Sequence, residues 1–109
     1  MKAKATIDKE LMILARSGKA LLGYKSVIRT LKRGTPRVKA VILAENMPEE
    51  RKKTIMYYAK LLEVPLLIYP SSSIELGRAY GRPHLISTLA VIDEGDSSIL
   101  KMEDGTIEK

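Results

Sequence analysis

The chain has 109 residues, 45% hydrophobic and 29% charged, which suits one globular domain over residues 1–109 with a buried core and excludes a disordered chain. It has no Cys and one His, which excludes a disulfide framework and a metal site built from thiolates or several His residues. It has no apolar run near the roughly 18 residues of a membrane span and no signal-peptide pattern, so we expect a cytoplasmic protein without a membrane segment. The net charge is +6, with −4 on residues 93–109 and therefore about +10 on residues 1–92, which indicates a polyanionic partner.

Two helices are predicted in the first third of the chain. The first spans residues 7–16 and can end at Gly18. The second begins near Ala20 or Gly23 and ends at Gly34. In both, apolar side chains recur at helical spacing: Ile7, Leu11 and Leu14, then Tyr24, Val27, Ile28 and Leu31.

The middle of the chain predicts a strand, a helix and a second strand. Residues 38–44 form a continuous apolar run typical of a buried strand. Pro48 fits the first position of a helix that runs to about residue 62. A short strand follows at residues 66–69. The inward face of the helix is expected to hold Ile55, Tyr58, Ala59 and Leu62.

The last third begins with a capping box. Ser72 with Glu75 three residues later predicts the start of a short helix. Residues 87–92 predict a third strand, and residues 99–101 form a short edge strand or belong to a helix that begins at Asp96. The alternation of helices with apolar strands favours α/β layers around a small sheet.

This order of elements brings two chain segments to the same edge of the sheet. The second helix feeds the first strand through a short turn, so the two run antiparallel. The residues 23–25 at the helix start should therefore lie beside Asn46 and Arg51, which follow the strand. Ligand sites in open α/β sheets favour this carboxyl edge.

The helix that starts at Pro48 is unusually basic in its first turns. Arg51, Lys52 and Lys53 stand where a cation costs the helix about 0.3–1 kcal/mol. Such a cluster indicates that the cations bind a ligand outside the fold, most plausibly a phosphate at the helix N-terminus. The alternative is a solvated charged face softened by the two preceding Glu residues.

Enzyme chemistry finds little support. There is no Cys nucleophile and no G-x-S-x-G elbow, and Ser17-Gly18-Lys19-Ala20 lacks the spacing of a P-loop. The acidic residues 93–96 are better explained as a surface turn than as a cation site. We therefore expect no enzyme activity and no cofactor. The alternatives left open are a small α/β ligand-binding module or enzyme fragment with a pocket at the same edge and a protein adaptor that uses residues 93–109.

A set of short motifs occurs in a specific order along the chain. It comprises Ser17-Gly18-Lys19, Leu22-Gly23-Tyr24-Lys25-Ser26, residues 44–48 centred on Asn46, Tyr57-Tyr58-Ala59, Glu75-Leu76-Gly77, Gly81-Arg82-Pro83-His84 and Ile92-Asp93 with Gly95-Asp96-Ser97. Over about residues 8–101 this order resembles the archaeal and eukaryotic large-subunit ribosomal proteins of the "L thirty e" family, the archaeal members most closely.

The resemblance implies a three-layer α/β/α sandwich around a four-stranded mixed sheet. It also implies a structural constituent of the large ribosomal subunit that binds a kink-turn, a sharply bent internal loop of ribosomal RNA, through one edge of the sandwich. Neighbouring ribosomal proteins would be further partners on the ribosome, and the free protein would be a monomer. A non-ribosomal kink-turn protein of another ribonucleoprotein is the alternative within the same resemblance.

The family pattern assigns roles to five residues around the basic edge. Gly23 would let RNA approach the helix start, and Lys25 would contact a phosphate or a guanine edge. Asn46 would read a base edge in the sheared A·G pairs through its amide. Arg51 and Lys52 would neutralise phosphates at the bend. The alternatives are a helix-start glycine, a solvated lysine and an asparagine that only caps the helix from Pro48.

The family pattern also assigns a role to the loop of residues 82–87. This loop would pack on extruded bases, which RNA commonly presents to proteins, through Arg82, His84 and Ile86. Two positions depart from relatives. Glu45 places a carboxylate next to Asn46, where relatives often carry neutral or basic residues. His84 stands where eukaryotic relatives tend to have a bulky aromatic side chain, which weakens hydrophobic stacking as its role.

Overall fold

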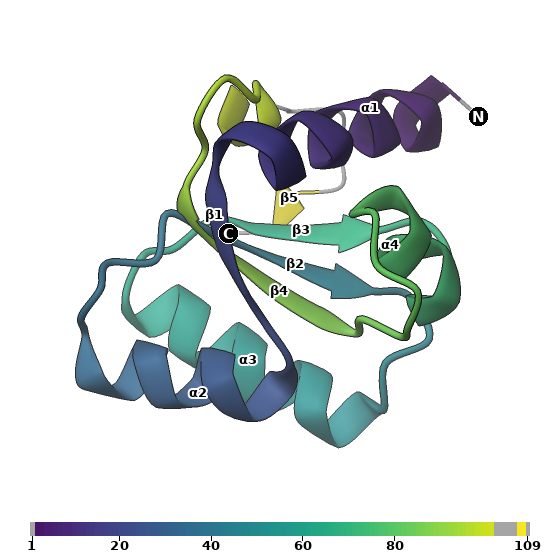
Figure 1. The fold of residues 1–109 in the computed structure, drawn as a ribbon. Coiled ribbons are helices and arrows are strands. Elements are labelled where there is room, and N and C mark those ends of the chain that lie inside the picture. Colours follow the sequence, from purple (N-terminus) through teal and green to yellow (C-terminus); the bar gives the residue numbers. More distant parts are fainter. Residues whose placement is uncertain (1, 102–106, 109) are drawn as a thin grey trace.

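A mixed β-sheet lies between two layers of helices in the computed structural model, which describes residues 2–101 and 107–108 (Figure 1). The elements in chain order are α1 (Lys2–Ser17), β1 (Lys19–Leu22), α2 (Tyr24–Arg33), β2 (Ala40–Ala44), α3 (Glu49–Leu61), β3 (Leu66–Tyr69), α4 (Ser73–Ala79), β4 (Thr88–Asp93), the 3-10 helix η1 (Ile99–Lys101) and β5 (Ile107–Glu108).

The sheet places β2 at its centre. Among the described residues the strand order is β1-β4-β2-β3-β5, with β2 parallel to β3 and antiparallel to β4. Ala44 at the end of β2 pairs with Tyr69 at the end of β3, so both strands finish at one edge. All five residues of β2 are buried, because helices cover both faces of the sheet.

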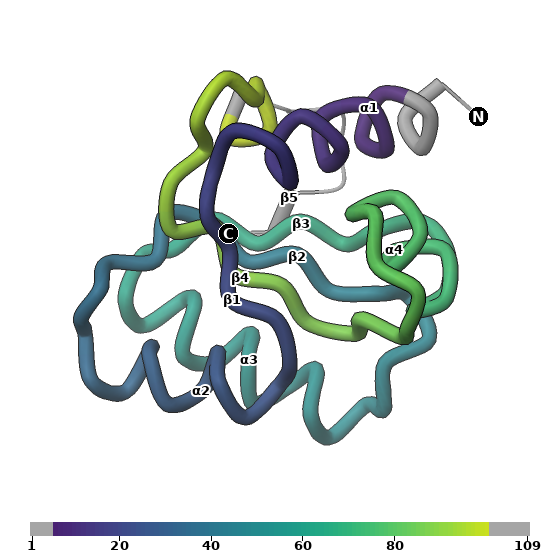
Figure 2. The backbone as a smooth tube through the Cα atoms, in the orientation of Figure 1, coloured from purple at the N-terminus to yellow at the C-terminus, as the bar shows by residue number. Residues whose placement is uncertain are grey.

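The two helix layers follow from the alternation of side chains along β2. Val41 and Leu43 pack with α2 and α3 in one cluster, whereas Ile42 packs with α1 and α4 in the other. β1 carries the chain from the α1 side of the sheet to the α2 side (Figure 2). The expected three-layer α/β/α sandwich is therefore confirmed.

Three of the four predicted strands are present as β2, β3 and β4, whereas the predicted strand at residues 99–101 is not, and β1 was not predicted. Lys19–Leu22 is a strand, and the second helix begins after it, at Tyr24. Of the two predicted starts of that helix, Ala20 is therefore wrong and Gly23 is one residue early. Residues 99–101 form a 3-10 helix rather than an edge strand. Lys19–Leu22 is too short to show a period, and its conformation comes from pairing with β4.

Two details of helix placement also differ from expectation. α3 begins at Glu49, with Pro48 at the position before the first helical residue. Leu62, expected to face inward, has 44% of its surface exposed because α3 ends at Leu61. In contrast, β3 spans the predicted residues 66–69.

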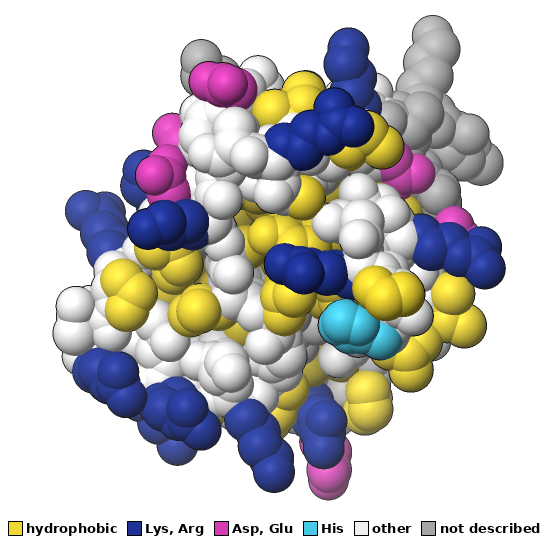
Figure 3. All heavy atoms as spheres, in the orientation of Figure 1, with side chains coloured by type: hydrophobic (Ala, Val, Ile, Leu, Met, Phe, Trp, Pro, Cys, Tyr) yellow, Lys and Arg dark blue, Asp and Glu magenta, His cyan; other side chains and the backbone are white. Residues whose placement is uncertain are grey.

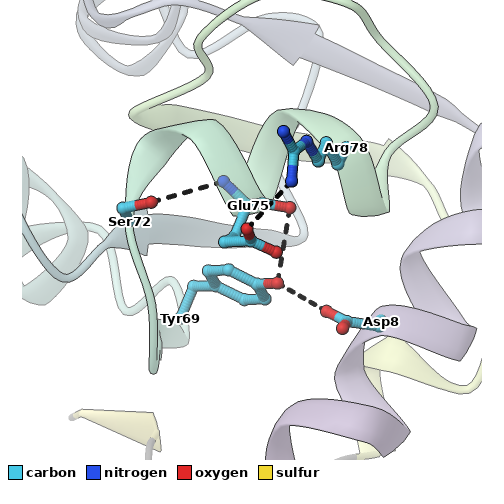
Figure 4. Close-up of polar contacts among 5 residues, drawn as sticks. All are labelled: Asp8, Tyr69, Ser72, Glu75 and Arg78. Atoms are coloured by element: carbon cyan, nitrogen blue, oxygen red, sulfur yellow. Dashed lines mark hydrogen bonds and ion pairs between the residues drawn. The ribbon is translucent and has the colours of Figure 1, made fainter.

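Polar contacts of Tyr69 join β3 to α1 and to α4, and two further contacts lie within the start of α4 (Figure 4). Ser72 Oγ accepts a hydrogen bond from the Glu75 N–H at 3.4 Å, as the capping box predicts. The hydroxyl of the fully buried Tyr69 donates to Asp8 Oδ1 at 2.6 Å and lies 3.4 Å from the Glu75 carbonyl oxygen. Arg78 pairs with the Glu75 carboxylate at 3.3 Å. These contacts fix the helix that follows the carboxyl edge of the sheet.

Candidate nucleic-acid interface

Backbone hydrogen bonds bring three chain segments to the carboxyl edge of β2 and β3. The Gly23 N–H donates to the Thr88 carbonyl at 2.9 Å, and the Ala44 N–H donates to the Ser87 carbonyl at 3.0 Å. The start of α2, the segment after β2 and the loop before β4 are therefore neighbours, as Figures 1 and 2 show. The predicted juxtaposition of residues 23–25 with residues 46–51 is confirmed.

Gly23 has a backbone conformation that favours glycine. Its φ is 100° and its ψ 142°, and a Cβ built on it would meet no atom within 4 Å. The first observation explains why glycine is needed here, because L-residues rarely adopt this region. The second shows open space in front of the backbone, where a ligand can approach closely.

Arg51 lies over the ring of Tyr24. The Arg51 Cζ is 5.0 Å from the ring centroid, which is the geometry of a cation–π contact between the starts of α3 and α2. Lys52 donates from Nζ to the Glu45 carbonyl oxygen at 3.2 Å. Both cations are therefore oriented at the edge, and the exposed Lys25 makes no hydrogen bond or ion pair with any residue that the structure describes.

Asn46 caps a helix, but not the one expected. Its Oδ1 accepts a hydrogen bond of 3.0 Å from the N–H of Ser73, the first residue of α4. The interpretation of Asn46 as a cap for the helix from Pro48 is wrong, since that helix start has no side-chain cap. Because the oxygen is engaged within the protein, the amide offers its two N–H donors to a ligand.

The loop before β4 presents some of the predicted residues and buries one. Arg82 and His84 are exposed, and the Arg82 guanidinium lies 5.6 Å from the Tyr80 ring centroid. Ile86 is 2% exposed, so its expected contact with RNA is wrong. Its N–H bonds the Ser73 carbonyl, which turns the side chain into the core, and the neighbouring Leu85 is 63% exposed.

A shallow hollow of about 330 Å³ lies between this loop and α4. It is lined by Ile74, Arg78, Arg82, Pro83, His84 and Leu85. Figure 3 shows the single histidine, in cyan, next to hydrophobic side chains and surrounded by separate dark blue cations. The hollow thus combines apolar surface with positive charge, which suits a base and its phosphate.

Three residues at this edge have roles that were not predicted from the sequence. Tyr24 supports Arg51, Ser73 orients the Asn46 amide, and Leu85 offers the apolar surface assigned to Ile86. A bulky apolar residue after His84, in a loop of Gly, Arg and Pro, was the available indication for Leu85. The other two depend on contacts between elements distant in sequence.

The described residues contain no cluster of three or more His, Asp or Glu side chains that could hold a metal ion. Within the same part of the chain, none of the helices has the length and apolar character needed to cross a membrane.

The model of the "Ribosomal protein L7Ae/L30e/S12e/Gadd45 family" matches residues 5–101. The chain belongs to this family. A large ribosomal subunit protein eL30 from Pyrobaculum islandicum is 51% identical over 96 residues, which cover 88% of this chain and 93% of the relative. One from Tetrahymena thermophila is 45% identical over 97 residues, covering 89% and 91%.

A solved structure supports the same fold for this member of the L7Ae/L30e/S12e/Gadd45 family. A protein described as having unknown function, from Bacillus halodurans C, superposes with a TM-score of 0.73 at 26% identity. The match covers 87% of this chain and 92% of that one. The shared sandwich therefore extends over nearly the whole of both proteins.

Proposed function

We propose that this L7Ae/L30e/S12e/Gadd45 family member is a structural constituent of the large ribosomal subunit in the cytoplasm, with ribosomal RNA and neighbouring ribosomal proteins as partners. The relatives at 51% and 45% identity, both named large ribosomal subunit protein eL30, support this role. At a finer level, its RNA target is a kink-turn, and the free protein is a monomer. The role is architectural rather than enzymatic.

The observation that carries the RNA target is the assembly of unlike groups at one sheet edge. Gly23 leaves its backbone open, Asn46 offers amide donors whose direction Ser73 sets, and Arg51 is held on Tyr24. A donor pair can read the acceptors of a base edge, while nearby cations neutralise crowded phosphates. A uniform charged surface would provide only the second of these functions.

The hollow beside α4 supplies a place for an unpaired base. Ile74 and Leu85 are 51% and 63% exposed, which provides apolar surface beside His84 and Arg82. A nucleotide extruded from the bend would stack against this surface with its phosphate near a cation. Because the bent RNA offers such a nucleotide and a paired duplex does not, the hollow favours the bent form.

The mechanism follows from differential affinity. The protein binds the bent conformer better than the extended one and so shifts the RNA population toward the bend. No catalytic step is required, and the charge at the edge offsets the repulsion between phosphates that the bend brings together.

A titration against two RNAs at one salt concentration tests the proposal. One RNA carries a kink-turn loop between short stems, and the other is a fully paired duplex of equal length. We expect binding to the kink-turn to be tighter by about 100-fold or more, since specific nucleic-acid complexes exceed non-specific ones by at least such factors. Equal, salt-sensitive binding to both RNAs would contradict the proposal and favour charge alone.

A further inference from the structure

The outer face of α2 is basic along its whole length. Its ten residues include four cations and no acidic residue. Lys25, Arg29 and Lys32 are spaced by four and three positions, which places them on one stripe of the helix, opposite the buried Val27 and Leu31. Arg33 lies beside this stripe, and all four side chains are exposed.

Intramolecular hydrogen bonds and ion pairs do not explain why these cations are present on α2. In the described part of the chain, Lys25, Arg29 and Arg33 have no hydrogen bond or ion pair with a protein group. Among the residues that the structure describes, Lys32 contacts only the Tyr58 ring, with its Nζ 5.8 Å from the ring centroid. Helix-dipole stabilisation accounts for Lys32 and Arg33 in the last turn but not for Lys25 and Arg29.

The stripe is continuous with the candidate interface. α2 starts at Gly23 in that interface and runs away from it for about 15 Å, at 1.5 Å per residue. Tyr24 contacts Arg51 at one end and Lys32 contacts Tyr58 at the other, so α2 and α3 lie side by side in the same direction. Figure 3 shows the dark blue side chains along the rim where Figure 1 places α2.

The surrounding charge has the same sign. Residues 24–61, which contain both helices, hold ten Lys or Arg residues and three Glu. An RNA that is bound at the candidate interface and continues along α2 would therefore contact cations over the whole length of the helix. An acidic protein would have no contact at the interface to align it with α2. Continuity with the interface selects RNA as the occupant.

We infer that α2 binds the phosphate backbone of one of the two RNA stems that leave the bend, through Lys25, Arg29, Lys32 and Arg33. This inference rests on the proposed function and extends it from the internal loop to its flanking helix. The 15 Å length of α2 is enough to follow several successive base pairs of a stem. The contact is sequence-independent, because A-form stems are recognised mainly through backbone and shape.

The test varies the length of each stem separately. Kink-turn RNAs are made with about two base pairs in the stem under test, held by a closing loop, or with that stem extended to about ten, and binding to each RNA is measured from 50 to 300 mM salt. For one of the two extended RNAs we expect tighter binding and a salt slope steeper by about two, one for each added phosphate contact. If neither extension changes the slope, α2 does not contact a stem.

Three variants assign the effect to α2. Arg29→Gln/Lys32→Gln/Arg33→Gln should remove the gain from the extended stem and leave binding to the short-stem RNA nearly unchanged. The charge-keeping variant Arg29→Lys/Lys32→Arg/Arg33→Lys should retain the gain. The matched control Lys9→Gln/Arg16→Gln/Lys19→Gln removes three exposed cations outside the α2–α3 layer and should also retain it. Equal losses in the first variant and the control would overturn the inference.

The two proposals fail separately. A protein that prefers the short-stem kink-turn to the duplex but ignores stem length retains the proposed function and loses only the contact along α2. A protein without preference for the kink-turn loses the proposed function itself. Circular dichroism and thermal unfolding of each variant check that its affinity is measured on folded protein.

Discussion

The side-chain oxygen of Asn46, after β2, accepts a hydrogen bond of 3.0 Å from the backbone N–H of Ser73, the first residue of α4. This bond joins the two chain segments that follow adjacent parallel strands. It satisfies one of the free donors at a helix N-terminus and simultaneously sets which half of the amide faces outward. A single residue thus serves both the fold and the candidate interface, and substitutions can separate the two roles.

Asn46→Asp separates them. The carboxylate keeps an acceptor for the Ser73 N–H and places negative charge at a helix start, which is favourable by about 0.3–1 kcal/mol. We expect an unfolding free energy that is unchanged or higher, measured in urea, together with weaker kink-turn binding because the N–H donors are gone.

Asn46→Ala tests the base-reading role. The loss of the donors should cost about 1–3 kcal/mol of kink-turn binding and little binding to duplex RNA. The loss of the Ser73 cap should also lower the unfolding free energy by about 0.5–2 kcal/mol. If binding to both RNAs falls by the same factor, Asn46 does not read a base.

Arg51→Ala should flatten the salt dependence of kink-turn binding by about one phosphate contact, measured as the slope of log Kd against log salt. The reason is that Arg51 is held on Tyr24 at the interface and forms no ion pair within the described part of the chain. Lys60→Ala removes an exposed cation near the other end of α3 and serves as the control. An unchanged slope in Arg51→Ala would show that Arg51 contacts no phosphate and belongs to a solvated charged face of α3.

Gly23→Ala should lower stability by about 1–3 kcal/mol, because the backbone region it occupies is nearly restricted to glycine. Gly34→Ala is a matched control. Gly34 ends the same helix with a φ of 82° and equally open space around a built Cβ. Both variants should lose stability in thermal unfolding, but only Gly23→Ala should lose kink-turn affinity at a temperature where both are folded. Equal affinities would show that RNA does not approach Gly23 closely.

Tyr69→Phe should lower the free energy of unfolding by about 1.5–3 kcal/mol, because the hydroxyl is buried and bonds a carboxylate. That hydrogen bond to Asp8 joins β3 to α1 (Figure 4). Tyr57→Phe, at a 62% exposed position, should change stability by less than about 0.5 kcal/mol. Kink-turn affinity should stay within about twofold in both variants. A stable Tyr69→Phe would mean that the hydrogen bond contributes little beyond packing.

The ion pair between Lys39 and Glu94 predicts a local pH dependence. The hydrogen bond to Glu94 at 2.8 Å, together with the charge of that carboxylate, raises the pKa of Lys39 above its usual value. The contribution of the pair to stability is therefore complete below the ordinary lysine pKa of about 10.4 and is lost as the pH rises through the folded-state pKa. In Glu94→Gln the pKa of Lys39, followed by NMR, should fall. An unchanged pKa would show that the pair does not persist in solution.

The sequence by itself determined the layers of the sandwich and the place of the interface. The apolar run that contains β2 is buried on both faces, and in a chain that alternates helices with strands the helices supply that cover. The antiparallel relation between α2 and β2 follows from their short connection, so the adjacency of Gly23 and Asn46 was predictable. These inferences depend on local hydrophobic patterns and short loops, which act over few residues.

Tertiary structure alone decided the features that depend on distant partners. Lys19–Leu22 becomes a strand because β4 offers an edge to pair with, and residues of this kind carry no period of their own over four positions. Ile86 is buried and Leu85 is exposed because the Ile86 N–H bonds the Ser73 carbonyl and turns one side chain inward. The amide of Asn46 points as it does because α4, 27 residues further along the chain, supplies the donor. Such contacts form only when the sheet is assembled, since their geometry is set by packing between elements rather than by the residues beside them.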